Sequence, residues 1–84
     1  MINLKSMRIS GKYHSTVIAR LISMENETFN RFNPNFDQVM AGAENTYDLK
    51  LPSEKMDSFL ANKYQILMES VQFLLNESAS AVSK

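Results

Sequence analysis

The chain has 84 residues, which is enough for one small domain with a modest hydrophobic core. Nine basic residues balance nine acidic ones, so the composition gives no electrostatic reason to expect binding to nucleic acid or to an acidic membrane. There is no cysteine, which excludes a disulfide framework and a thiolate metal site. No apolar run is long enough to span a bilayer, and residues 1–9 lack the apolar core of a signal peptide.

The first two predicted elements are a strand and a helix. Residues 2–6 alternate between apolar and polar side chains, beginning with Ile2 and Leu4, which is typical of a half-buried strand. The Ser10-Gly11 pair predicts the turn that follows. A helix is predicted over residues 15–24, because its apolar residues recur at the spacing that puts them on one helical face. These residues are Val17, Ile18, Leu21 and Ile22.

A second short helix is predicted over residues 26–32, with Phe29 and Phe32 facing inward. Pro34 ends this helix, because the residue before a proline avoids the helical region of backbone conformation. Residues 35–45 have no clear periodicity and are predicted to form a loop.

The clearest strand covers residues 46–51, where a tyrosine and two leucines alternate strictly with polar residues. Immediately after it, Ser53 is a suitable helix N-cap and Glu54 complements the helix dipole. They open a helix that is predicted to run unbroken to about Asn76. Residues 77–84 are small and polar, and we expect them to form a flexible tail.

The predicted fold class is α+β, in the order strand, helix, helix, strand and long C-terminal helix. A two-stranded ribbon alone is marginally stable, so both short helices are expected to cover one of its faces. The chain is thereby divided into a βααβ unit over residues 1–52, a C-terminal helix over residues 53–76 that packs on this unit and extends beyond it, and the tail.

A resemblance to a known family lies in the segments ETFNRFNPNF and YDLKLPSEKMDSFLANK. They resemble the LysM-like module of membrane-bound lytic murein transglycosylase D-type proteins, in which a helix ending in Asn-Pro precedes a loop, an aromatic-x-Leu-x-Leu-Pro strand and a further helix. The resemblance covers about residues 2–60. The matching residues are Phe29, Phe32, Asn33, Pro34, Phe36, Tyr47, Leu49, Leu51, Pro52, Lys55 and Phe59. Residues 8–12 stand where LysM modules usually have a Gly-Asp-Thr-like turn.

The resemblance implies a non-catalytic accessory module of a cell-wall lytic transglycosylase, located in the periplasm or cell envelope. It also implies that peptidoglycan glycan lies between the first strand-helix loop and the loop after the second helix. Amides, hydroxyls and an aromatic face suit N-acetylated sugars. The residues implied are Arg8, Ser10, Gly11, Lys12, Asn35, Phe36, Asp37 and Gln38. The alternative is that these are ordinary loop residues, with Phe36 filling the core.

No catalytic constellation is visible in the sequence, so the chain is not expected to be an enzyme by itself. His14 is the single histidine, so a histidine-centred metal site would need carboxylates for every other ligand, and no cofactor is expected. The catalytic glutamate of the resembled transglycosylases belongs to a separate lysozyme-like domain. A helix-turn-helix role in DNA binding is disfavoured, because the second predicted helix has Arg31 as its cation and acidic Glu25 and Glu27 at its start.

The C-terminal helix predicts a second kind of function, a protein-interaction or dimerisation module without sugar binding. From Ser53 to Asn76 the helix would be roughly 34 Å long, which is more than the preceding unit covers along one side. Its apolar arc approaches half of the circumference, wider than the roughly 100° stripe of an ordinary surface helix.

The two halves of this helix have different predicted roles. The first half is expected to pack on the domain through Met56, Phe59, Leu60 and Tyr64. The second half is expected to expose an apolar patch that binds a second copy or a neighbouring catalytic domain. The patch consists of Ile66, Leu67, Val71, Phe73, Leu74 and Leu75. The alternative is a helix that breaks near Asn62-Lys63 and folds back over its own core.

Overall fold

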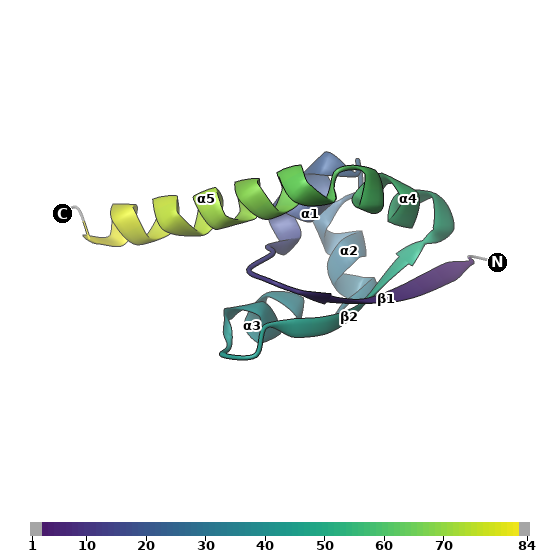
Figure 1. Cartoon of the computed structure of the whole chain (residues 1–84), viewed down its shortest axis with the longest axis horizontal. Helices are drawn as coiled ribbons and strands as arrows, with labels where there is room; N and C mark the ends of the chain where they lie inside the picture. The colour runs from purple at the N-terminus through teal and green to yellow at the C-terminus, as the bar shows by residue number, and fades with distance from the viewer. Residues whose placement is uncertain (1–2, 83–84) are drawn as a thin grey trace.

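Two antiparallel strands and five helices make up the described part of the chain (Figure 1). The computed structural model describes residues 3–82, and it describes the side chains of residues 3–77. The chain is therefore α+β, as predicted. In chain order the elements are β1 (Leu4–Ser10), α1 (Ser15–Leu21), α2 (Asn26–Phe32), α3 (Phe36–Ala41), β2 (Thr46–Pro52), α4 (Ser53–Ala61) and α5 (Lys63–Val82).

The two-stranded ribbon has one buried face and one exposed face. β1 and β2 pair antiparallel, with Met7 opposite Leu49. On the inner face, Leu49 and Leu51 of β2 are buried together with Ile9 of β1. Apolar and polar residues alternate over residues 46–51 because every second side chain of this strand enters the core.

The N-terminal strand has a different register from the one that the sequence predicts. β1 extends to Ser10, and its residue Ile9 is buried. Because side chains alternate between the two faces of a strand, the other odd-numbered residues of β1 lie on the inner face with Ile9. Leu4 therefore lies on the outer face opposite Pro52 and is 43% exposed. The prediction that Leu4 faces the core is wrong, and Ile2 lies outside the described residues.

The first two helices lie over one face of the ribbon (Figure 1). α2 has the predicted bounds, and Phe29 from this helix is in the core. α1 ends at Leu21, earlier than predicted, because Ser23 adopts a left-handed φ of 59° and turns the chain toward α2. Lys55 of α4 donates hydrogen bonds to the carbonyls of Ile22 and Ser23, at 3.1 and 3.0 Å, and so satisfies the end of α1.

The segment after Pro34 contains a third helix, so the prediction of a loop over residues 35–45 is wrong. Asn35 has a φ of 62°, in the left-handed region that asparagine tolerates, and this residue is the N-cap of α3. Phe36 and Met40, one turn apart on this helix, both enter the core. The unit is therefore βαααβ rather than βααβ.

The helix predicted to run unbroken from Ser53 to Asn76 is divided at Asn62. The Asn62 side chain donates a hydrogen bond to the Ser58 carbonyl at 2.9 Å, which competes with the helical backbone pattern. The Asn62 carbonyl in turn accepts from the backbone N–H of Ile66 at 2.8 Å and starts α5. Phe59 of α4 and Ile66 of α5, on either side of the break, are both in the core.

Helix α5 makes the molecule elongated. Its first half packs against α1, whereas its C-terminal half extends beyond the other elements (Figure 1). The molecule measures 48 × 23 × 22 Å and has a radius of gyration of 12.9 Å, whereas a compact domain of this length has about 12 Å. Residues 77–82, predicted to be a tail, continue α5 as helix, and residues 83 and 84 lie outside the described residues.

Candidate interaction surface on α4 and α5

Helix α5 has an inner face that packs on the domain. Ile66 is completely buried, and Ser70 is buried one turn further along. The Ser70 hydroxyl accepts a hydrogen bond from the backbone N–H of His14 at 3.0 Å. The half-buried Phe73 packs on the His14 ring, with ring centroids 4.6 Å apart. This face therefore anchors the first half of α5 to the start of α1.

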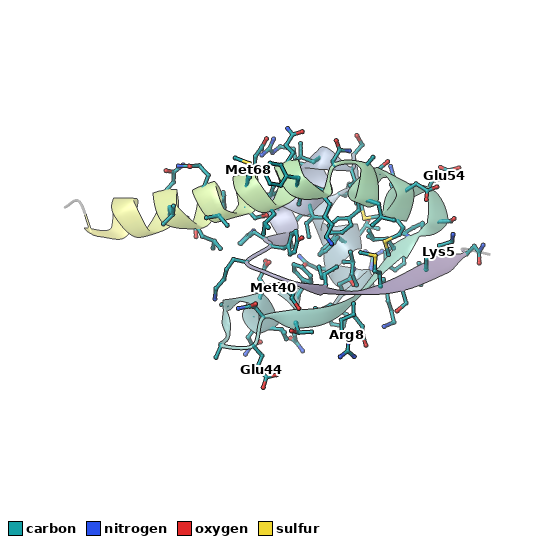
Figure 2. All side chains as sticks on the ribbon, viewed as in Figure 1. Lys5, Arg8, Met40, Glu44, Glu54 and Met68 are labelled. Carbon is teal, nitrogen blue, oxygen red and sulfur yellow. The ribbon has the colours of Figure 1, made fainter. Side chains whose placement is uncertain are left out.

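The opposite face of α4 and α5 is apolar and lies in solvent. Its members, called here the outer apolar surface, are Leu60, Tyr64, Leu67, Met68, Val71, Leu74 and Leu75. Leu67 and Leu74 are half-buried and the other five are exposed, with Tyr64 77% and Leu75 59% exposed. Steps of three and four residues place the members from α5 on one stripe. Figure 2 shows Met68 on the side of α5 that is turned away from the sheet.

Charge is sparse along α5. Its charged residues are Lys63, Glu69 and Glu77. Glu69 accepts hydrogen bonds from Gln65 and from Arg20 of α1, each at 2.9 Å, and these bonds lower the pKa of its carboxyl group. The outer apolar surface therefore contains no charge, although a surface helix ordinarily presents charged and polar residues to solvent.

Two hollows border the outer apolar surface. The first hollow is lined mainly by Tyr13, Leu60, Tyr64 and Leu67, with Lys63 at its edge. The second hollow is lined by Lys12, Ala41, Val71, Leu74 and Leu75. Both lie where α5 meets the loop between β1 and α1, so the surface is grooved along one flank.

Gly11 lets this loop approach α5 closely. Its φ is 139°, a conformation that side-chain-bearing residues rarely adopt. A β-carbon at this position would lie 3.1 Å from the ring of Tyr13 and 3.3 Å from Cδ1 of Leu67. The residue that the sequence associates with a glycan loop therefore has a packing role beside the outer apolar surface.

The other residues implied by the LysM resemblance near the first strand have separate partners. Arg8 lies on the outer face of the ribbon and forms an ion pair with Asp48 at 3.0 Å (Figure 2). The Ser10 hydroxyl is hydrogen-bonded to that of Thr46 at 3.2 Å. Lys12 donates to the Gly42 carbonyl at 3.4 Å. Arg8 thus points away from the helices, whereas Lys12 lies at the second hollow.

The implied residues after α2 are mostly used by the fold. Phe36 is only 1% exposed, and Asn35 supplies the left-handed turn before α3. The Asp37 carboxylate accepts hydrogen bonds from the backbone N–H and the hydroxyl of Ser15, at 2.8 and 2.6 Å, and so holds the start of α1. Gln38 is exposed. The Phe36 ring is therefore not available as a platform for a sugar.

Several residues of the C-terminal region differ in exposure from the prediction. Leu60 and Tyr64, predicted to pack on the domain, are exposed, and Ile66, predicted to be exposed, is in the core. Phe73 is half-buried. Met68 belongs to the surface but was not predicted there, because the inner face was placed on the stripe of Leu60 and Tyr64 rather than on that of Phe59 and Ile66.

Comparisons with known proteins give no relative for this chain: no family model matches, and no curated protein or solved structure is significantly similar. Within residues 3–82, no group of three or more histidine, aspartate or glutamate side chains is placed to hold a metal ion. None of the helices described is both long and apolar enough to cross a membrane.

Proposed function

We propose that the chain is a protein-interaction module that dimerises through the outer apolar surface. The observation that carries this proposal is a row of five exposed apolar side chains along α4 and α5 with no charge among them. Monomeric soluble proteins rarely expose contiguous apolar patches larger than a few hundred Å². Removing such a surface from water stabilises an association by about 25 cal/mol per Å² before the entropic cost of binding is subtracted.

The shape of α5 also favours a helical partner. Apolar residues in steps of three and four form the stripe through which two helices pack side by side. The C-terminal half of α5 extends beyond the other elements (Figure 1), and short helical segments are marginally stable in water without packing. A second α5 offers both the matching stripe and the packing that this half needs.

Charges introduced on the surface should separate the dimer. We expect the Val71→Glu, Leu75→Glu double variant to be monomeric by light scattering at concentrations where the unmodified chain is dimeric. Both side chains are exposed in the single chain, so the variant should keep its fold. The dissociation constant should rise at least about 100-fold, because each buried unpaired charge costs several kcal/mol.

The matched control is the Gln72→Glu, Asn76→Glu double variant. It adds the same charge to the same part of α5, but both residues lie off the stripe and are hydrogen-bonded to each other at 3.3 Å. This control should remain dimeric, and circular dichroism should show native helix content in both variants. An unmodified chain that is monomeric at high micromolar concentration would contradict the proposal.

A second candidate function is the glycan-binding accessory module of a lytic transglycosylase in the cell envelope. What favours it is the LysM resemblance together with the two-stranded antiparallel ribbon next to the helices. NMR titration with chitin or peptidoglycan fragments tests it, because binding in the predicted groove should shift the amide signals of residues 10–12 and 35–38 together. Unchanged signals at millimolar ligand, which corresponds to about 4 kcal/mol of binding free energy, would leave dimerisation as the proposed function.

A further inference from the structure

We infer that the two copies pair antiparallel, so that the projecting half of α5 in each copy fills the first hollow of the other. This inference rests on the proposed dimerisation and specifies its geometry. The starting observation is that the outer apolar surface has a hollow near each of its ends, and that the helix extends beyond the other elements at only one of them. Near α4 the first hollow lies beside Tyr64 and Leu67, and further along α5 Leu74 and Leu75 line the second hollow, after which the helix projects.

Only an antiparallel pair brings these two ends together. Leu74 lies ten residues after Tyr64, which is about 15 Å along the helix axis. In a parallel pair Leu74 would face Leu74, and the hollow beside Tyr64 would receive no side chain from the projecting half. In an antiparallel pair the projecting half lies directly along the first half of the other α5.

The apolar spacing is compatible with an antiparallel register that also brings the end charges together. If Leu67 faces Val71 of the second copy, then Tyr64 faces Leu74, because each of these is three residues further from the centre of the pair. The dyad repeats both contacts on its other side. Every central contact is therefore between apolar side chains, and Leu75 of each copy lies close to the first hollow of the other.

The charged residues at the two ends favour the same orientation. Lys63 lies at the edge of the first hollow, and Glu77 is an exposed residue just beyond Leu74 and Leu75. The register given above places Glu77 of one copy about two residues, or ~3 Å along the axis, from Lys63 of the other. A parallel pair would instead place lysine beside lysine and glutamate beside glutamate. Antiparallel helix dipoles add to this preference.

Cysteine cross-linking tests the orientation, because the chain contains no cysteine of its own. Two single variants, Tyr64→Cys and Leu74→Cys, are purified and then mixed before mild oxidation. We expect the mixed disulfide dimer to be the main product, and each variant alone to cross-link poorly. The two positions are about 15 Å apart within one helix, far beyond disulfide reach, so no intrachain bond competes. Leu67→Cys mixed with Val71→Cys provides a second pair with the same expectation.

Charge reversal gives a readout that does not depend on cross-linking geometry. Lys63→Glu and Glu77→Lys should each weaken the dimer several-fold at low salt, and the double variant that exchanges the two charges should restore it. A parallel pair predicts no such rescue, because each residue would only meet its own copy.

Light scattering on the same samples separates the failure of this inference from the failure of the proposed function. A dimer in which Tyr64→Cys and Leu74→Cys each cross-link with themselves overturns the antiparallel arrangement and leaves dimerisation standing. A dimer in which neither mixed pair cross-links, and in which exchanging the charges rescues nothing, overturns it as well. A monomeric unmodified chain removes the proposed function together with the inference.

Discussion

Replacing Asn33 by aspartate should destabilise the domain by about 3 kcal/mol or more, which is the largest effect that we expect from a change of so few atoms. The Asn33 side chain is completely buried. Its amide nitrogen donates to the carbonyls of Lys50 and Phe29, at 2.9 and 3.2 Å, and its oxygen accepts from the Lys50 backbone N–H at 2.8 Å. A carboxylate keeps the size of the side chain but turns both donated bonds into contacts between a buried negative charge and carbonyl oxygens.

The domain should be sensitive to this change because Asn33 satisfies backbone groups at the edge of β2. Asn33 pairs with both backbone groups of Lys50 in the way that a neighbouring strand would, and thereby links the end of α2 to β2. Unfolding in urea or by heat measures the loss. A domain of this size has roughly 4–12 kcal/mol of total stability, so the variant should melt well below the unmodified chain or be unfolded at room temperature.

Asn30→Asp is the matched control for this prediction. It makes the same chemical change on α2, but Asn30 is exposed and its amide donates only to Asn26, at 3.3 Å. The control should change the free energy of unfolding by about 0.5 kcal/mol or less. Equal stability of the Asn33 and Asn30 variants would show that the hydrogen bonds to Lys50 contribute nothing.

Replacing Phe36 by alanine should cost about 3–5 kcal/mol. The Phe36 ring lies edge-on between Phe29 and Tyr47, with ring centroids 5.1 and 5.0 Å apart. The Tyr47 hydroxyl donates to the Pro34 carbonyl at 2.7 Å and fixes one wall of this cluster. Alanine would remove the ring and leave a cavity that these neighbours cannot fill. Calorimetry or urea unfolding gives the loss directly.

Two further variants distinguish a core role from a role in binding. Phe36→Leu should lose less than about 2 kcal/mol, because it keeps most of the apolar volume. Val39→Ala, on the exposed side of the same helix, should lose about 0.5 kcal/mol. If Phe36→Ala instead melted at the same temperature as the unmodified chain and lost only affinity for sugar, the glycan hypothesis would replace the core assignment.

The sequence predicts best the elements that have a regular apolar pattern. The strand over residues 46–51 and the helix at Asn26–Phe32 were both predicted, because alternation and the three-residue spacing of two aromatic residues are local signals. α3 was missed because it has only Phe36 and Met40 as a periodic pair and begins with the left-handed Asn35. The role of Asn33 was missed because its partner, Lys50, is distant in sequence and presents only its backbone.

The candidate surface was predicted in part. Val71 and Leu75 are exposed as expected from an apolar arc that is too wide for one small domain. Leu60 and Tyr64 were assigned to the wrong face, because the inner face is the one marked by Phe59, Ile66 and Ser70, which recur at spacings of seven and four residues. The break between α4 and α5 is itself marked by the hydrogen bond from the Asn62 side chain to the Ser58 carbonyl, which leaves no trace in the apolar periodicity.

The exposure of Tyr64 has a spectroscopic consequence. The chain has three tyrosines and no tryptophan, so its near-ultraviolet emission comes from tyrosine alone. Tyr13 is buried and Tyr47 is half-buried, and burial raises the pKa of both hydroxyls. Tyr64 is by contrast open to solvent, and a soluble quencher such as iodide reaches its ring first. The unlabelled protein therefore carries its own optical probe at the outer apolar surface, and covering this surface makes the emission harder to quench.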